Sequence, residues 1–334
     1  MIKNVLTVLL FVAVRAFAAG GVNDMYPHAE LVKSQERYER RVGEMFSSGL
    51  WEVMNGAEKQ ALSGVRIELP LKGDGPLDAF SYINAGVPTV AFPVLSLKFI
   101  EDLSVTYAWR HVNRHSLEPI DEYLAMLKYR RPEDFPGARV PDPPTALGVP
   151  PRIWEQDKRV DELSLRFRNT AWAFILAHEL GHLRFRHPGN KQVPPEVSQR
   201  NEMEADAFAV ALLSRSDTIP MGMILWFQAS VGYFKNRADF RTEAAYREWM
   251  QSEATHPINP ERLQRLAVAL NHAADASLSP KNAEVLRFIA GKVVGMGDIL
   301  TEPDMQRLIA RCAVLGRPED LKRLHDRPCD ERLK

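Results

Sequence analysis

Apolar side chains recur at helical spacing near the start of the chain, and this pattern predicts a helix over residues 28–62. Leu31, Tyr38 and Val42 fall on one side of that helix, with charged residues between them. Residues 65–69 instead alternate between apolar and polar side chains, which is typical of a strand. We therefore expect a packing helix followed by a strand.

A second extended segment, residues 89–94, is flanked by Pro88 and Pro93. Proline cannot donate a hydrogen bond to a neighbouring strand, so prolines at these positions favour an edge strand. Helical spacing returns over residues 95–131. The sequence thus places a strand at the border of a sheet, followed by a long helix.

Prolines dominate residues 132–151, where seven of them fall within one stretch. We expect a long loop there, and long loops inside a compact domain are often functional lids or connectors. Helical spacing resumes near Asp161, stops at residues 188–189 and continues through most of the remaining chain. Together these elements predict a mostly helical α+β fold with a small mixed sheet.

The composition narrows the function classes. Of 334 residues, 45% are hydrophobic and 26% are charged, and 43 basic side chains balance 43 acidic ones. A chain of zero net charge has no overall field to attract nucleic acid or an anionic membrane, and its apolar content is too high for disorder. We therefore expect no nucleic-acid partner.

The first residues indicate export. Lys3 precedes an apolar run over residues 5–14, and the Ala-Phe-Ala triplet at 16–18 suits cleavage by signal peptidase. We interpret residues 1–18 as a cleavable signal peptide, which predicts a periplasmic or secreted protein. The later apolar stretch at 219–234 is shorter than the roughly 20 residues that a bilayer requires, so we expect no stable membrane span after signal removal.

The chain has two cysteines, Cys312 and Cys329, which excludes a disulfide-dense scaffold and a cysteine-rich metal cluster. An oxidising compartment would permit a disulfide between them. The sequence does not show whether their Cα atoms lie close enough, so a bonded pair and a reduced pair both stay open.

The clearest chemistry lies in an apolar helix expected over 171–183, whose ionisable members are His178, Glu179 and His182. Burying three such groups without partners would be very costly. The two histidines are four residues apart, so their imidazoles leave one face of the helix and can converge on a tetrahedral zinc. Glu179 would lie beside the metal, and His-Glu-Leu-Gly-His is the zincin signature. The alternative is a pair of core histidines bonded to backbone carbonyls.

A catalytic zinc needs a third protein ligand and an open position for water. A histidine six residues after His182 would be one solution, but Pro188 stands there. His187 is one residue off, and we assign it to the helix end, where a donor meets free carbonyl groups. His111 and His115 also have helical spacing, but no acid adjoins them, so we expect no second metal site.

Residues 201–209 offer two glutamates for the third position. Helical geometry places Glu202 and Asp206 on one face among small residues, whereas Glu204 points about 200° away. Glu202 is therefore the expected third ligand, and Asp206 is placed to accept the second ring N–H of a ligating histidine. A solvated acidic helix face is the alternative.

Three motifs follow one another along the chain: residues 178–182, the Glu-Met-Glu-Ala-Asp segment at 202–206, and Thr-His-Pro at 255–257 with Arg262. In this order they resemble the gluzincin family of CAAX prenyl proteases and bacterial heat-shock proteases, over about residues 80–270. The resemblance implies a zincin-like metallopeptidase domain that cleaves peptide bonds.

The resemblance also implies one zinc ion (Zn2+) per chain and a role for individual residues. It implies that His178, His182 and Glu202 bind the zinc and that Glu179 is the general base. It also places His256 near the oxyanion and makes Asp206 and Arg262 supporting residues. For His256, a position in a surface loop is the alternative.

These expectations divide the chain into segments. They are a signal peptide at 1–18, an N-terminal helical segment at 19–62, a zincin-like metalloprotease domain at 63–274 with its proline-rich insert at 132–151, and a C-terminal helical appendage at 275–334.

The resulting hypothesis is an exported zinc-dependent metalloendopeptidase that acts on polypeptides, with quality control of envelope proteins implied by the resemblance. An extended substrate would pair with the strand at 89–94. One alternative is a noncatalytic zinc-binding or chaperone-like interaction protein on the same scaffold. Another is a self-inhibited zymogen whose segment 132–151 covers the cleft. The sequence leaves the oligomeric state and the substrate open.

Overall fold

The computed structural model describes residues 21–189, 192–252, 256–323 and 329–333. Helices predominate in these residues, and three short strands form one mixed sheet. This confirms the expected mostly helical fold with a small mixed sheet. The predicted signal peptide, residues 1–18, lies outside the described residues.

The helical elements of the first half are α1 (His28–Glu44), η2 (Met45–Leu50), α2 (Trp51–Val53), α3 (Gly56–Ala61), α4 (Val94–Val112), α5 (Glu118–Tyr129), η3 (Pro132–Asp134), η4 (Pro136–Ala138), α6 (Pro143–Ala146) and α7 (Ile153–Gln156). Those of the second half are α8 (Lys158–Phe185), α9 (Pro195–Arg215), α10 (Met223–Tyr233), η6 (Arg237–Asp239), α11 (Glu243–Ser252), α12 (Pro260–Ala276), α13 (Pro280–Thr301), α14 (Pro303–Leu315), η7 (Pro318–Lys322) and α15 (Cys329–Arg332). The strands are β1 (Arg66–Glu68), β2 (Phe80–Asn84) and β3 (Val87–Ala91).

The sheet has the order β1-β3-β2, with β3 parallel to β1 and antiparallel to β2. The prediction that residues 89–94 form an edge strand is therefore wrong, because β3 is the central strand. Pro88 is tolerated in this strand because β1 pairs only with Thr89–Ala91, and Pro93 lies beyond the strand, directly before α4. An edge is formed instead by β2, a strand that the sequence analysis missed.

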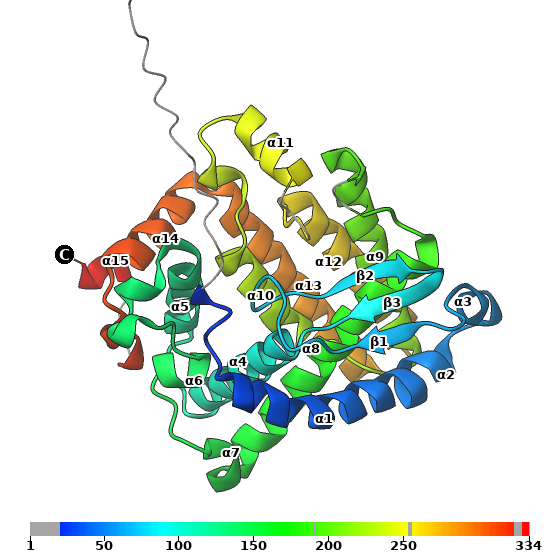
Figure 1. Ribbon diagram of the computed structural model, residues 1–334, viewed down its shortest axis with the longest axis horizontal. Helices are drawn as coiled ribbons and strands as arrows, with labels where there is room; N and C mark the ends of the chain where they lie inside the picture. Colours follow the sequence, from blue (N-terminus) through cyan, green and yellow to red (C-terminus); the bar gives the residue numbers. More distant parts are fainter. Residues whose placement is uncertain (1–20, 190–191, 253–255, 324–328, 334) are drawn as a thin grey trace, which may run out of the picture.

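The long helix α8 is central to the molecule. It packs against α4 and α9 and also touches β2 and β3, so the sheet lies against this helix (Figure 1). Asp157 caps its first turn by accepting a hydrogen bond from the backbone N–H of Arg159. Trp172 and Phe174 are fully buried and anchor the helix in the core. The turns that follow, with the ionisable residues of the expected zinc motif, therefore lie in the interior.

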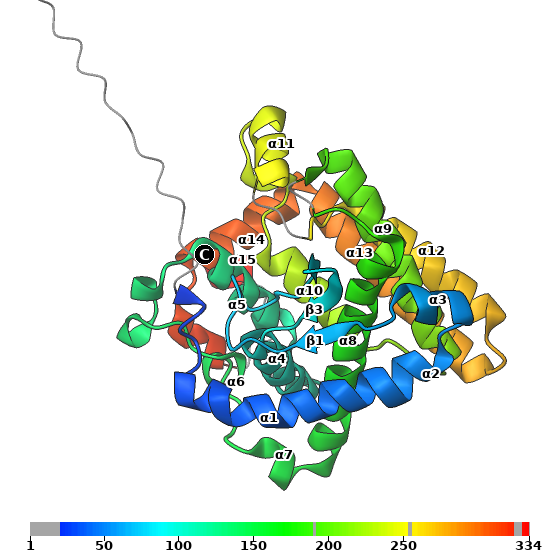
Figure 2. The ribbon, with the colours of Figure 1, turned by 45° about the vertical axis from the view of Figure 1, so that its right-hand side comes forward.

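Two expected helices are each divided into shorter ones. The helix expected over 28–62 consists of α1, η2, α2 and α3, with extended backbone at Met54 where α2 ends. The helix expected over 95–131 ends at Val112, and α5 begins at Glu118. Because α1 packs along α4, the N-terminal helices border the same core as α8 (Figure 2).

Residues 132–151 include the short helical turns η3, η4 and α6. Phe135, Val140 and Leu147 are buried within this segment, and α6 packs against α4 and α5. The proline-rich segment is thus packed into the described fold on the side of α4 and α5.

The C-terminal helices return to α5. Arg130, at the end of α5, donates hydrogen bonds to the carbonyl groups of Ala313 and Val314 at the end of α14. Cys312 and Cys329 form a disulfide, which decides between the two alternatives left open by the sequence. In the part of the chain that the structure describes, none of the helices combines the length and apolar character needed to cross a bilayer.

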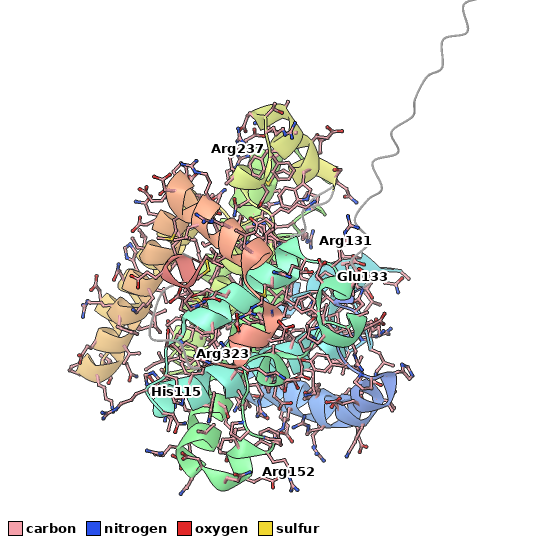
Figure 3. All side chains as sticks on the ribbon, turned by 90° about the vertical axis from the view of Figure 1, so that its left-hand side faces the viewer. His115, Arg131, Glu133, Arg152, Arg237 and Arg323 are labelled. Atoms are coloured by element: carbon pink, nitrogen blue, oxygen red, sulfur yellow. A yellow bond between two sulfur atoms is a disulfide. The ribbon has the colours of Figure 1, made fainter. Side chains whose placement is uncertain are left out.

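The short helix α11 stands at the border of the molecule, where it touches α9 (Figure 2). Arg237, which is labelled beside α11 in Figure 3, pairs with Glu243 at 2.7 Å. The rings of Phe240 and Trp249 also meet, with their centroids 5.4 Å apart. These contacts join α11 to the residues that directly precede it.

Candidate metal centre

The site forms where α8 and α9 cross. A Cβ atom at Gly181 would lie 3.0 Å from the Cα atom of Ala205 and 3.2 Å from the ring of Phe208. Because glycine has no side chain, the two helices can approach closely at this point. The close approach brings the two histidines of the α8 motif against Glu202 on α9.

Four side chains converge at this crossing, and each offers one ligating atom. The Nε2 atoms of His178 and His182 lie 3.1 Å apart, and each lies 3.4 Å from an oxygen of Glu202. The Nδ1 atom of His256 lies 3.1 Å from the Oε2 atom of Glu202. All four ligating atoms fall within 4.8 Å of one another. His182 is partly exposed, and the other three side chains are buried.

This donor set fits a zinc ion. With tetrahedral Zn–N distances of about 2.0–2.1 Å, two nitrogen ligands lie about 3.3 Å apart, which is close to the 3.1 Å between the two Nε2 atoms. The Oε1 atom of Glu202 is buried and has no hydrogen-bond partner among the described residues. Such an orphaned atom is costly unless a ligand satisfies it. The four side chains could therefore hold one metal ion.

The surroundings keep two of the four side chains, His182 and Glu202, in forms that bind metal. Burial lowers the pKa of His182 well below its ordinary value, so that its imidazole is neutral. Burial opposes the ionisation of Glu202, but His256 and Arg262 outweigh it and hold the pKa of that carboxyl well below its usual range. The site thus presents a neutral imidazole beside a carboxylate.

Asp206 and Arg262 contact the ligands from behind. The Nδ1 atom of His178 lies 2.8 Å from Oδ1 of Asp206, and Arg262 donates to both oxygens of Asp206 at 2.7 and 2.9 Å. Arg262 also lies 2.8 Å from Oε2 of Glu202. A carboxylate beyond a ligating histidine fixes the orientation of the ring. Asp206 and Arg262 therefore lie where they can support the ligands.

His256 is buried inside the site, which excludes the surface-loop alternative. Its Nε2 atom lies 2.8 Å from the carbonyl oxygen of Ala79, and its Nδ1 atom faces Glu202. Burial opposes the protonation of His256, but Glu202 and Glu179 outweigh it and raise its pKa to about 10. Its ring nitrogen lies within 4.8 Å of the ligating atoms of the other three side chains, so the geometry makes His256 a fourth candidate ligand, which must lose its proton to bind a metal ion. Thr255, from the same Thr-His-Pro motif, lies outside the described residues.

Glu179 is the acidic residue beside these donors. It is 1% exposed, and neither of its carboxylate oxygens has a hydrogen-bond partner in the described part of the chain. Its Oε1 atom lies 3.5 Å from Nε2 of His256. A general base needs such an oxygen, placed beside the metal position and free to accept a proton.

His187 and Glu204, which were not predicted to belong to the site, also adjoin it. The Nδ1 atoms of His187 and His182 lie 3.0 Å apart, and Nε2 of His187 lies 3.0 Å from Oε2 of Glu204. His187 does follow the end of α8, but its ring folds back onto the last turn of the helix. The Pro-Gly pair at 188–189 was the available signal, since a helix that stops there turns the residues beyond its end toward its final carbonyls.

The other histidine pair, His111 and His115, lies apart from this cluster. The ring of His111 stacks on Tyr107 with the centroids 6.1 Å apart. The ring of His115 packs on Trp109 with the centroids 5.1 Å apart. These two histidines therefore contact aromatic side chains around the end of α4.

The family described as Peptidase U49 matches residues 128–281 of the chain. This stretch includes α8, α9 and α12, and with them every residue of the metal cluster. No curated protein and no solved structure matches the chain. The expectation of a peptidase thus has support over the matched residues, whereas kinship with the CAAX prenyl proteases and bacterial heat-shock proteases stays a prediction.

Proposed function

We propose that the protein is an exported, zinc-dependent metalloendopeptidase. One observation carries the proposal, namely that four converging metal donors lie beside the unpartnered carboxylate of Glu179. The match of residues 128–281 to a peptidase family supports the same reaction class. Export rests on the signal-peptide pattern at 1–18, and envelope proteins under quality control are the proposed substrates.

The reaction assigns separate tasks to the residues of the cluster. His178, His182 and Glu202 would hold the zinc ion. When bound, zinc polarises a peptide carbonyl and lowers the pKa of water toward about 7. Glu179 takes a proton from the attacking water on one of its free oxygens and then delivers it to the nitrogen of the departing amine. His256 lies close enough to Glu179 to stabilise its charge, with 3.5 Å between Nε2 and Oε1.

An extended substrate would bind along β2. This strand pairs with β3 on one side, and its other edge has no partner strand in the sheet of the described residues. Ala79, directly before β2, contacts His256 through its carbonyl oxygen, so this edge begins at the metal cluster. Backbone pairing at a strand edge requires no free chain end, which favours cleavage inside a polypeptide.

A second function, noncatalytic zinc binding, is favoured by the position of His256. Four protein ligands close a zinc site, as in structural sites, whereas three ligands leave a position for water. If His256 binds zinc together with the other three donors, no position remains for the reaction. However, a noncatalytic site has no use for the buried, unpartnered carboxylate of Glu179, which lowers stability. We therefore favour the peptidase.

The test compares the protein from residue 19 onward with its Glu179→Gln variant, which keeps the shape of the side chain and removes the base. Bound zinc is measured together with the cleavage of casein. We expect about one zinc per chain in both proteins and a loss of activity of about 10²- to 10⁴-fold in the variant. Stoichiometric zinc without activity in either protein would favour the noncatalytic function. The absence of zinc from both would refute the proposal.

A further inference from the structure

The two histidines of the α8 motif have different partners behind their rings. Behind His178 lies Asp206, which is buried and bound to Arg262. Behind His182 lies His187, at 3.0 Å between the two Nδ1 atoms. The opposite ring atom of His187, Nε2, lies 3.0 Å from Oε2 of Glu204. The second histidine therefore has a support of its own, built from His187, which lies outside the three sequence motifs, and from Glu204.

The end of α8 fixes this support in place. Arg186 adopts the left-handed conformation, with φ 56° and ψ 43°. The backbone N–H of His187 then donates to the carbonyl oxygen of His182 at 3.0 Å, as in a Schellman motif. His187 is thus tied to His182 through its backbone as well as its ring. Its ring also stacks on Phe185 with the centroids 5.6 Å apart, and its side chain is only 7% exposed.

We infer that His187 and Glu204 are positioning residues, which orient His182 for the metal; this inference rests on the proposed zinc site. A histidine that binds metal through Nε2 carries its proton on Nδ1. His182 directs Nε2 toward the cluster, so its Nδ1–H donates to Nδ1 of His187. His187 in turn carries its proton on Nε2 and donates it to the carboxylate of Glu204.

The two contacts, His182 to His187 and His187 to Glu204, are together compatible with one protonation pattern. If Nδ1 of His187 carried the proton, two N–H groups would face each other across 3.0 Å. Glu204 prevents this pattern because its carboxylate can only accept a hydrogen bond from Nε2. The carboxylate is 53% exposed, so its pairing with His187 adds little to folding stability. Its contribution is to the orientation and basicity of the ligand.

The test measures zinc affinity by competition with a chromophoric chelator, using the full mature chain. His187→Phe keeps the stacking on Phe185 and removes both ring nitrogens, so we expect zinc affinity to fall by about 10- to 100-fold. His187→Asn returns an acceptor close to the position of Nδ1 and should recover part of that affinity. The unfolding temperature of the metal-free proteins is measured in parallel, because a merely structural role would change it together with the affinity.

Glu204→Gln tests the outer link and has a matched control on the same helix. Glu196 also lies on α9, is 50% exposed and pairs with Arg247, away from the metal cluster. We expect Glu204→Gln to weaken zinc binding by about 3- to 10-fold, since the amide keeps an acceptor but loses the charge. Glu196→Gln should leave the affinity unchanged. Glu204 is half-exposed, so this comparison stays decisive even if His187→Phe does not fold.

The possible outcomes separate this inference from the proposed function. Unchanged affinity in both His187→Phe and Glu204→Gln, with zinc bound to the parent, would overturn the positioning role and leave the metal site intact. Equal losses in Glu204→Gln and Glu196→Gln would also overturn it, because a general charge effect would then suffice. If the parent itself binds no zinc, the proposed function fails, and the inference fails with it.

Discussion

Glu101 on α4 and Glu179 on α8 are both largely buried glutamates, yet their oxygens have very different surroundings. Glu101 accepts a hydrogen bond from Tyr38 at 2.6 Å and from each of two arginines, Arg37 and Arg168, at 2.8 Å. Glu179 accepts no hydrogen bond among the described residues. The carboxylate of Glu101 joins α1, α4 and α8. The carboxylate of Glu179 has no hydrogen-bond donor in the described part of the chain and lies beside the side chains that could bind a metal ion.

The difference separates a structural acid from a functional one. Among the described residues, the carboxylate oxygens that are buried without a hydrogen-bond partner belong to Glu179 and Glu202. Both residues lie at the crossing of α8 and α9. A fold that satisfies the oxygens of its other buried carboxylates and leaves these three without a hydrogen bond retains them for a ligand or a reaction, because buried oxygens without a hydrogen bond lower stability.

The largest expected effect concerns the structural acid. Glu101→Gln keeps the shape of the side chain but leaves the buried guanidinium of Arg168 without its counter-charge. Removing one partner of a buried ion pair lowers the free energy of unfolding by about 3 kcal/mol. Urea unfolding of the metal-free protein would measure this loss. Zinc content should stay at the parent's level, and a loss of zinc would mean that the two regions are coupled.

The pH dependence of this effect has a definite sign. Burial opposes the ionisation of Glu101, but Arg37, Tyr38 and Arg168 outweigh it and lower its pKa. A lowered pKa stabilises the fold above the ordinary glutamate value of about 4.3 and loses this contribution as the pH falls further. The difference between the parent and Glu101→Gln should therefore shrink below about pH 4.

The same substitution at the functional acid should have a much smaller effect on stability. Glu179→Gln removes no hydrogen bond, and the lost attraction to His256 at 3.5 Å is offset because a charge without hydrogen bonds is no longer buried. We expect the free energy of unfolding to stay within about 1 kcal/mol of the parent. Urea unfolding in the presence of a chelator checks this. A loss as large as that of Glu101→Gln would remove the distinction between the two acids.

The local part of the site could be predicted from the sequence because helical geometry fixes it. His178 and His182 are four residues apart on one helix, and so are Glu202 and Asp206. This spacing alone places each pair on one face of its helix, so the prediction requires no knowledge of the fold. The position of His256 could not be predicted in this way. It contacts the carbonyl group of Ala79, 177 residues earlier in the chain, and tertiary packing alone brings the two together.

The helical character of the fold was predictable for the same reason, whereas the sheet was not. Helical spacing is a local property, but the order β1-β3-β2 depends on which strands meet in space. The sequence of β2 does not alternate clearly between apolar and polar residues, since Tyr82 and Ile83 are adjacent, and all residues of the strand are half-buried or exposed. Pro88 and Pro93 indicated an edge, because the sequence does not reveal that β1 pairs only with Thr89–Ala91, between the two prolines.

Backbone strain does not distinguish the region of the metal cluster from the region around α4, in contrast to the buried carboxylate oxygens without a hydrogen bond. A small change in the free energy of unfolding can show this. Arg186 follows α8 beside the site and Arg114 follows α4 away from it, and both adopt positive φ angles, 56° and 59°. The left-handed conformation costs a non-glycine residue about 1–2 kcal/mol. Glycine loses about 0.5–1 kcal/mol through its greater freedom in the unfolded chain. Arg186→Gly and Arg114→Gly should therefore each raise the free energy of unfolding by about 0.5 kcal/mol.

Urea unfolding of the metal-free variants measures these gains, and chelator competition shows whether they affect the metal. Both variants should bind zinc like the parent, because Arg186→Gly keeps the backbone turn that places His187 against His182. Weaker zinc binding in Arg186→Gly alone would mean that the arginine itself helps to hold the turn. In that case the side chain of Arg186 would join His187 among the residues that support His182.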